Sequence, residues 1–250
     1  MPSDRHVLKA HLWEGWDALE TDQRKGLPPP PLQKPPPRDA SRIDLVAPDA
    51  LTLDTPPLLE VIRRRRSRRT FSQQPLSQAE LSFLLWATQG VQEGTGDGVR
   101  ARRTVPSAGA RHPFETYLFV YPDRVTGLGT GLYRYLPLDH ALIQVSAEVG
   151  LADRVTEACR PGHRWVRNSA VLFIWTAIPY RTEWRYSVIA PKLIALDAGH
   201  VCQNLYLASE AIGAGACAIG AYDQARLDAA IGVDGTDEFV VYVAPVGKID

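Results

Sequence analysis

The spacing of apolar residues changes repeatedly along the chain and predicts a mixture of helices and strands. From Glu115 onward, short apolar runs of strand length are separated by stretches with helical periodicity. The run Ala170–Ile178 is apolar at almost every position, which is typical of a central strand buried on both faces. We therefore predict strands at 115–122, 131–137, 140–145, 170–178, 216–222 and 238–247.

Helices are predicted where apolar residues recur every three or four positions between recognisable end signals. Ser77 and Glu80 form a capping box before an apolar stripe that stops at Gly90. Asp223 is the expected cap of another helix. Because several strands adjoin hairpin-type turns, we predict an α+β sandwich with a mostly antiparallel sheet, not a doubly wound parallel one. The predicted helices cover 54–65, 75–90, 150–160, 192–212 and 223–232, the first with Leu58, Leu59 and Ile62 on its apolar face.

The N-terminal part differs from the rest in composition. Residues 28–37 read PPPPLQKPPP, which excludes a helix or central strand because proline fixes φ and lacks a backbone donor. We divide the chain into an extension, 1–53, and a folded domain, 54–250. The extension is expected to hold a short helical patch near Val7–Leu19 and an extended arm, with a disordered linker as the alternative. Trp13 and Trp16 favour docking of the patch.

Composition narrows the function classes. The 250 residues are 45% hydrophobic, enough for a real core, and the formal net charge of zero argues against a generic nucleic-acid binder. The three cysteines have no zinc spacing and the histidines do not cluster, so we predict no metal site. Sparse free thiols, no signal-peptide pattern and no membrane-length apolar run favour the cytoplasm.

The stretch Arg63–Phe71, RRRRSRRTF, concentrates positive charge in an otherwise neutral chain. It is embedded between an apolar helix and a capped one, and Ser67 lies among the arginines. A hydroxyl combined with guanidinium groups suits a phosphate. A solvated charged face and a nucleic-acid patch are the alternatives.

Two further stretches contain small residues at which a ligand can approach the backbone. Val105–Pro113, VPSAGARHP, is such a segment, although taken alone it is better explained as a plain turn before the strand at Glu115. Ala211–Gly220, AIGAGACAIG, contains Gly213 and Gly215 but is not a dinucleotide fingerprint, because a helix precedes it and a strand follows. It reads as a tight helix-to-strand turn.

Four segments in order resemble the nitroreductase family of FMN enzymes, and within it the thiazole/oxazole-forming peptide dehydrogenases, or azoline oxidases. They are RRSRRTF from Arg65, PSAGARHPFETYLFV from Pro106, DAGHVCQNLYLASEAIGAGACAIGAYD from Asp197 and DEFVVYVAPVG from Asp237. The resemblance covers about residues 40–250. It implies a nitroreductase-like α/β sandwich that forms an interlocked homodimer with FMN at the subunit interface.

The resemblance also implies roles for particular residues. Arg65, Arg66 and Ser67 would contact the FMN phosphate or ribityl chain, and Arg69 the pyrimidine edge of the flavin. The loop Pro106, Ser107, Ala108, Gly109 would pack on the isoalloxazine from the other subunit. Backbone groups at Ala214, Gly215 and Ala216 would contact the ring, and Lys248 would contribute to phosphate binding.

The sequence departs from the family pattern at two places. The Lys-Tyr pair of the azoline oxidases falls on Arg185 and Tyr186. Arginine stays protonated and is a poor general base, which weighs against azoline oxidation, although it can steer an anionic or carbonyl group. Tyr186 is the first candidate for proton transfer or substrate orientation. Ala110 stands where nitroreductases often have asparagine.

The leading prediction is therefore an FMN-dependent oxidoreductase that transfers hydride through flavin N5. NAD(P)H would serve with a nitro or quinone acceptor, whereas a peptide azoline would itself reduce the flavin. A flavin-fold binding or partner module without turnover is the second reading, and a nucleic-acid binder the third. Arg160–Asn168 and Tyr180–Pro191 are expected to line the substrate pocket.

Overall fold

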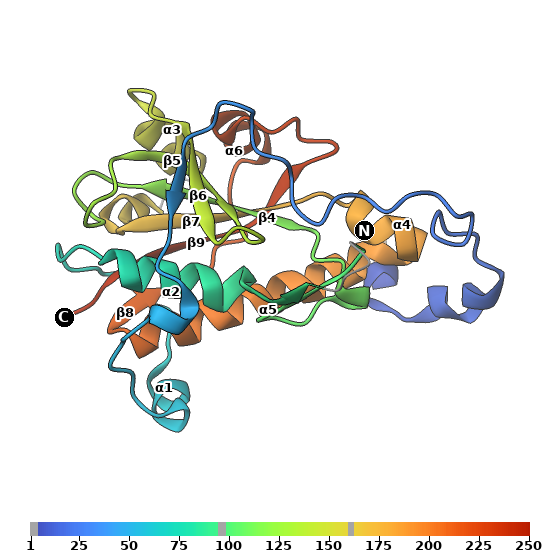
Figure 1. The fold of residues 1–250 in the computed structure, drawn as a ribbon, viewed down its shortest axis with the longest axis horizontal. Helices are drawn as coiled ribbons and strands as arrows, with labels where there is room; N and C mark the ends of the chain where they lie inside the picture. The colour runs from blue at the N-terminus through green and yellow to red at the C-terminus, as the bar shows by residue number, and fades with distance from the viewer. Residues whose placement is uncertain (1–4, 95–98, 160–162) are drawn as a thin grey trace.

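A single antiparallel sheet organises the molecule (Figure 1). The computed structural model describes residues 5–94, 99–159 and 163–250. Within these ranges the main sheet has seven strands in the order β1-β6-β5-β4-β7-β9-β8, and every neighbouring pair is antiparallel. The strands are β1 Arg42–Asp44, β4 Phe114–Val120, β5 Gly131–Leu136, β6 Ala141–Ser146, β7 Val171–Ala177, β8 Ala214–Ala216 and β9 Phe239–Lys248. A separate hairpin pairs β2, Val91–Gly94, with β3, Ala101–Arg103.

Helices cover both faces of this sheet. On one face lie α2 and the long α5, and on the other α3 and α6 (Figure 1). The α-helices are α1 Leu58–Arg64, α2 Gln78–Gln89, α3 Leu151–Ala158, α4 Tyr180–Tyr186, α5 Ala190–Ala211 and α6 Gln224–Ile231. Short 3₁₀ helices include Arg5–Leu8, His11–Ala18 and Ala108–Ala110. The fold class predicted from the sequence is confirmed.

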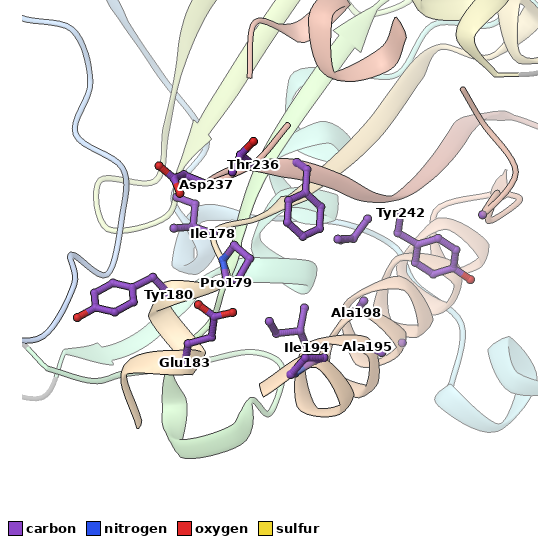
Figure 2. A pocket seen from close by; sticks show the side chains of 15 residues that line it. Ile178, Pro179, Tyr180, Glu183, Ile194, Ala195, Ala198, Thr236, Asp237 and Tyr242 are labelled. Carbon is purple, nitrogen blue, oxygen red and sulfur yellow. The ribbon is translucent and has the colours of Figure 1, made fainter. Parts of the chain in front are cut away.

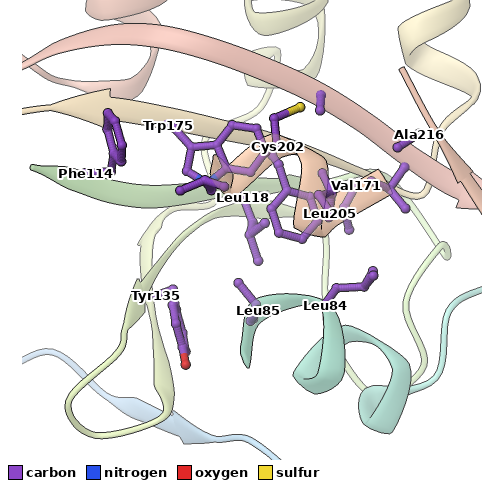
Figure 3. Packing of buried hydrophobic residues seen from close by; sticks show 14 of the residues in the cluster. Leu84, Leu85, Phe114, Leu118, Tyr135, Val171, Trp175, Cys202, Leu205 and Ala216 are labelled. Atoms are coloured by element: carbon purple, nitrogen blue, oxygen red, sulfur yellow. The ribbon is translucent and has the colours of Figure 1, made fainter. Parts of the chain in front are cut away.

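The larger core lies between the sheet and the pair α2 and α5 (Figure 3). Leu84 and Leu85 of α2 and Leu205 of α5 are fully buried against Phe173 and Trp175 of β7. Each such side chain contributes about 1.5–3 kcal/mol through removal from water. Because α5 is fixed along its length by this core, the residues at its two ends are held in defined positions.

Most predicted strands and helices are present, and the capping box of α2 is confirmed: Ser77 Oγ accepts from the Glu80 amide. Two expectations were wrong in detail. The strand expected at 216–222 is instead β8, Ala214–Ala216, followed by an isolated bridge at Ile219. The turn is completed earlier, at Gly213 with φ of +65°, so Ala214 already pairs with Lys248.

The first helix shows another difference. In α1 only Val61 is buried, whereas the side chains expected on its apolar face are exposed. Its first turn also has no side-chain cap. The helix projects from the body (Figure 1), so its apolar side chains have no core to meet within the chain. Their exposed fractions are 64% for Leu58, 61% for Leu59 and 54% for Ile62.

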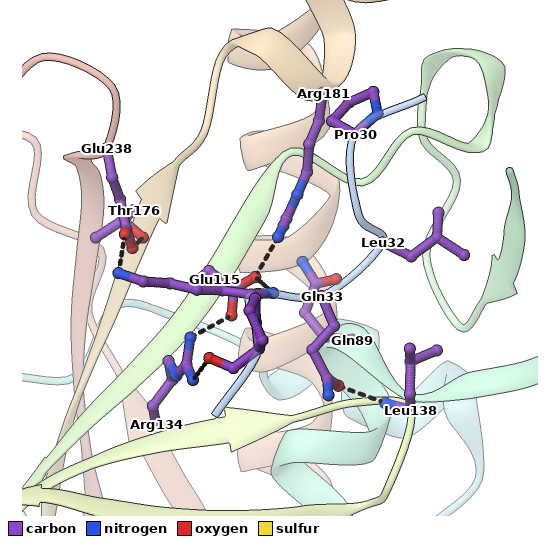
Figure 4. Close-up of polar contacts among 12 residues, drawn as sticks. Pro30, Leu32, Gln33, Gln89, Glu115, Arg134, Leu138, Thr176, Arg181 and Glu238 are labelled. Carbon is purple, nitrogen blue, oxygen red and sulfur yellow. Dashed lines mark hydrogen bonds and ion pairs between the residues drawn. The ribbon is translucent and has the colours of Figure 1, made fainter. Parts of the chain in front are cut away.

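The proline-rich arm lies extended over the domain and is tied to buried charged groups (Figure 4). The Lys34 amide donates to Glu115 at 2.8 Å, and its ammonium lies 2.5 Å from Glu238. Arg103 and Arg134 donate to carbonyls of the arm at 2.8 and 3.0 Å. Because an extended proline-rich segment makes no internal backbone hydrogen bonds, the carbonyls of Leu32 and Pro35 can accept from these arginines. No helix in the described ranges has the length and apolarity to span a bilayer.

Candidate active site

Helix α5 connects two groups of predicted site residues. Its last turn carries Glu210, beside the arginine run, and its N-terminal half carries Asp197, beside the Pro106–Gly109 loop. About 20 Å of helix separates these two acidic residues. The predicted site residues of one chain therefore form two clusters at opposite ends of α5. We call them the arginine cluster (Arg65–Arg69, Ala214–Ala216) and the Pro-Ser cluster (Pro106–Gly109, Arg185, Tyr186, Asp197).

In the arginine cluster, the segment after α1 runs beside β8. The Arg68 amide donates to the Ala216 carbonyl at 2.9 Å, and Ser67 forms a parallel bridge with Ala216. A Cβ on Gly215 would lie 2.5 Å from the Cβ and Cγ of Arg68. Glycine is therefore required there, since real Cβ contacts are longer. The structure thus brings the predicted Ser67 and Ala214–Ala216 together.

The arginines of this cluster differ in their partners. Glu210, which is buried, holds Arg64 at 3.3 Å and Arg68 at 3.8 Å. Arg65 lies over the Tyr206 ring, 5.4 Å from its centroid, and Arg69 lies 6.0 Å from that of Trp165. Within the described ranges, the guanidinium groups of Arg65, Arg66 and Arg69 form no ion pair or hydrogen bond. The Ser67 hydroxyl lies 3.0 Å from that of Tyr206, which can donate to it and leave the Ser67 proton for an anion. The cluster therefore offers cations and a hydroxyl to an anion.

Lys248 lies at the edge of the arginine cluster but already has partners. Its ammonium donates to the Glu80 carboxylate at 2.7 Å and to the Ile212 carbonyl at 2.6 Å. An ammonium group has three donors. Lys248 is therefore near the predicted phosphate position, with two of its donors engaged in holding α2 and the end of α5.

In the Pro-Ser cluster, a buried carboxylate fixes the loop. Ser107 Oγ donates to Asp197 at 2.6 Å, and the Ala108 amide donates at 3.2 Å. Ser107 Oγ in turn accepts from the His112 amide at 2.9 Å. Burial raises the pKa of Asp197, and the bonds from Ser107 and Ala108 oppose that shift. Sequence reasoning missed Asp197, although an acidic residue within an apolar helical stripe was a usable signal.

Gly109 brings this loop against the predicted catalytic pair. Its φ is +59°, and a Cβ there would lie 2.8 Å from both Arg185 Cδ and Tyr186 Oη. Tyr186 is 8% exposed, and the Arg185 guanidinium lies 5.5 Å from the centroid of its ring. Pro106, at the start of the loop, is exposed. Gly109, Arg185 and Tyr186 therefore form one compact group.

His112 follows the loop but cannot act as an acid or base near neutral pH. Its ring is buried, and Nε2 lies 2.9 Å from the Ala101 carbonyl. Burial, reinforced by the charge of Arg103, lowers the pKa of His112 to about 3. The imidazole is neutral and structural. The described residues also contain no group of three or more potential metal ligands.

A cavity of about 960 Å³ lies between α4, α5 and β9 (Figure 2). Tyr180 and Glu183 of α4 line it, together with Ala195 and Ala198 of α5 and Tyr242 of β9. None of the predicted cofactor-binding residues lines it. The expected substrate segment Tyr180–Pro191 contributes to this cavity. The other expected segment supplies Arg164 and Arg167 to a separate cavity, and its residues 160–162 lie outside the described ranges.

Comparison with known proteins identifies the family to which this chain belongs. Residues 62–248 match the model described as the nitroreductase family. "Putative nitroreductase MJ1384" of Methanocaldococcus jannaschii is 29% identical over 191 residues, 76% of this chain and 90% of that protein. A crystal structure of a "putative nitroreductase" from Ralstonia eutropha JMP134 is similar, with a TM-score of 0.68 and 27% identity, covering 90% of this chain and 99% of that one.

Two other similarities involve peptide-processing proteins. The trifolitoxin-processing protein TfxB of Rhizobium leguminosarum bv. trifolii is 31% identical over 119 residues, 46% of this chain and 31% of that protein. A chain of the Escherichia coli microcin synthetase McbBCD complex shares the fold, with a TM-score of 0.60 at 19% identity, covering 82% of this chain and 77% of that one. The chain belongs to the nitroreductase family, as the resemblance implied, and this membership indicates an oxidoreductase.

Proposed function

We propose that the protein is an FMN-dependent oxidoreductase whose site is completed by a second copy of the chain. The observation that carries this proposal is the separation of the two clusters along α5. Each cluster supplies half of what a flavin needs. The arginine cluster supplies cations for the phosphate, and the Pro-Ser cluster supplies a packed wall for the ring. A homodimer with its two α5 helices antiparallel would bring the arginine cluster of one copy to the Pro-Ser cluster of the other.

The donor set of the arginine cluster fits FMN. A phosphate dianion binds best to guanidinium groups that can make charge-assisted bonds, and Arg65 and Arg66 are available for this. Arg69 would place a positive charge near the pyrimidine edge, where reduction adds negative charge. When bound, FMN would supply the hydride chemistry, and the chain would position it and tune its electronics.

Exposed apolar surface supports a homodimer. The α1 side chains Leu58, Leu59 and Ile62 and Leu196 of α5 are each more than half exposed in the single chain. Ala195 and Gly199, also exposed, give α5 a narrow face that another helix can approach closely. Apolar groups on two neighbouring elements favour burial against another copy.

We assign different roles to the pair on α4. Tyr186, beside Gly109, would exchange a proton with the substrate or orient it through its hydroxyl group. Arg185 keeps its charge and would orient an anionic or carbonyl group without accepting a proton. A nitro or quinone acceptor with NAD(P)H as reductant suits this pair. The similarity to the trifolitoxin-processing protein TfxB favours a peptide as the second candidate substrate. For a peptide azoline, Arg185 in place of the lysine weighs against this candidate.

The test is an absorbance spectrum of the purified protein, followed by chromatography of the chromophore released by heating. Oxidised-flavin bands with FMN released, and bleaching of these bands on anaerobic addition of NADH or NADPH, would support the proposal. Bound FMN that no reductant or acceptor turns over would favour the alternative, a binding or partner module. A colourless protein that takes up no added FMN would refute both readings.

A further inference from the structure

The N-terminal segment is anchored to the same helix that carries Arg185 and Tyr186. The Tyr180 hydroxyl donates to Asp22 at 3.0 Å, and the Gln23 amide donates to the Trp184 carbonyl at 2.8 Å. Trp184 Nε1 donates to the Leu27 carbonyl at 2.9 Å. Three hydrogen bonds therefore fix the segment beside the Pro-Ser cluster. The segment lies before residue 62, outside the part of the chain that matches the family model.

Within this segment Arg24 holds Trp16 in place. Its guanidinium lies 4.6 Å from the centroid of the Trp16 ring. The same group donates to the carbonyls of Trp16 and Leu19 at 2.6 and 2.8 Å. The Trp16 carbonyl also accepts from the Leu19 amide at 3.2 Å, so Arg24 reinforces the end of the 3₁₀ helix His11–Ala18. The Trp16 indole is thus a fixed group.

Two indoles pack over Tyr186. The ring centroids of Trp13 and Trp16 lie 6.0 and 5.8 Å from that of Tyr186, and 5.1 Å from each other. These separations are typical of attractive aromatic pairs. Trp13 remains 38% exposed, so one indole keeps accessible surface next to the proposed catalytic group.

Arg185 completes this arrangement. Its Nε is buried and has no hydrogen-bond partner in the described ranges. The position that a Cβ on Gly109 would take lies 2.9 Å from this nitrogen, so the flavin-side loop and the unsatisfied donor are adjacent. A buried donor without a partner costs free energy, which a bound acceptor would recover.

We propose that Trp13, Trp16 and Arg185 form the substrate-selecting wall of the site and bind a planar ring that carries a carboxylate or carbonyl group. The ring stacks on the indole surface, and the negatively polarised oxygen accepts from Arg185. This inference rests on the proposed function, since it places the substrate beside the flavin-binding loop. It assigns a role to a segment that precedes the family-matching residues.

The experiment measures binding of 4-nitrobenzoate and neutral 4-nitrobenzamide to the FMN-loaded protein by calorimetry, without reductant. Trp13→Ala is compared with Leu12→Ala, because Leu12 is 39% exposed on the same helix and forms no ring pair. Trp13→Ala should raise the Kd of both compounds about threefold to tenfold. Leu12→Ala should leave both Kd values unchanged.

Arg185→Gln should remove the preference for the anionic compound, with a rise of about tenfold or more in the Kd of 4-nitrobenzoate and a smaller rise for 4-nitrobenzamide, whose neutral carbonyl accepts a weaker hydrogen bond. Arg185→Lys should restore part of that preference. FMN content and melting temperature, measured for every variant, exclude misfolding. Equal Kd values in Trp13→Ala and Leu12→Ala, or an unchanged preference in Arg185→Gln, would overturn the inference while FMN binding still upheld the proposed function. Failure to hold FMN would instead refute the proposed function.

Discussion

The arginine cluster and the Pro-Ser cluster contact the same helix, α5, toward its opposite ends, but they differ in almost every physical respect. In the arginine cluster, Arg66 and Ser67 are exposed and cations outnumber the acidic partners. In the Pro-Ser cluster, a buried carboxylate fixes the loop and Tyr186 is 8% exposed. The first has several cations but no enclosing wall, and the second has a wall with a single cation, Arg185. Such half-sites are expected where an interface completes the site.

The largest expected effect comes from removing the charges of the arginine cluster. Arg66→Gln combined with Arg69→Gln should weaken FMN binding by at least about a hundredfold, because each charge-assisted bond contributes about 1.5–3 kcal/mol. Arg63→Gln, in the same run but on α1, is the control and should change the Kd little. Fluorescence titration of FMN measures both. Equal losses in the two variants would mean that the run acts only as a diffuse positive field.

The glycines test how closely the backbone of the arginine cluster is packed. Gly215→Ala places a Cβ 2.5 Å from Arg68 side-chain atoms and should lower the free energy of unfolding by about 1–3 kcal/mol. Gly220→Ala, with no atom within 4 Å of its Cβ, should be nearly neutral. Chemical denaturation measures the difference. If Gly215→Ala left the free energy of unfolding unchanged, β8 and the arginine run would be able to move apart without cost.

The stability of the folded chain should depend on pH through His112, which follows the Pro106–Gly109 loop. The unfolded chain protonates His112 below about pH 6.5, whereas the folded chain keeps it neutral until about pH 3. The unfolded state binds more protons in that interval, so stability should fall as pH falls, by at most about 1.4 kcal/mol per pH unit for this group. His112→Gln should flatten the dependence between pH 6.5 and 4.5. Parallel curves for the two proteins would contradict the buried neutral assignment.

The smallest expected effect concerns the loop bond. Ser107→Ala removes one hydrogen bond to Asp197 and should lower the free energy of unfolding by about 0.5–1.5 kcal/mol, because the Ala108 amide still donates. The Kd of FMN should rise several-fold, because the change loosens the loop that packs on the flavin ring and leaves the phosphate-binding arginines intact. Ser72→Ala, outside both clusters, is the control. If Ser107→Ala binds FMN like the wild type, the loop does not contact the flavin.

The sequence predicted the sheet and its long helix because their signals are local. The capping box at Ser77 and the apolar run that became β7 depend on neighbouring residues alone. Helix α4 and strand β1 were missed because α4 mixes aromatic and charged residues over one short helix, and β1 is ordered by pairing with β6. Leu58 was misplaced because a periodic stripe indicates a buried face without saying which chain covers it.

The candidate site was predicted in the same partial way. The motifs around Ser67 and Ser107 supplied the candidate residues, which stay a prediction, and the structure adds their grouping toward opposite ends of α5. Asp197 and the contact of Trp13 and Trp16 with Tyr186 depend on three-dimensional packing. No local pattern in the sequence brings residues near position 13 to residue 186.

The most direct measurement of a shared site mixes two defective variants. One carries Arg66→Gln and Arg69→Gln, and the other carries Gly109→Val, which disrupts the Pro-Ser cluster. Each alone, checked for native folding, should bind little FMN. If one copy supplies the arginines and the other the loop, heterodimers carry one intact site, and a statistical mixture recovers about a quarter of the wild-type FMN binding. No recovery from heterodimers verified with two affinity tags would contradict a site shared between two chains.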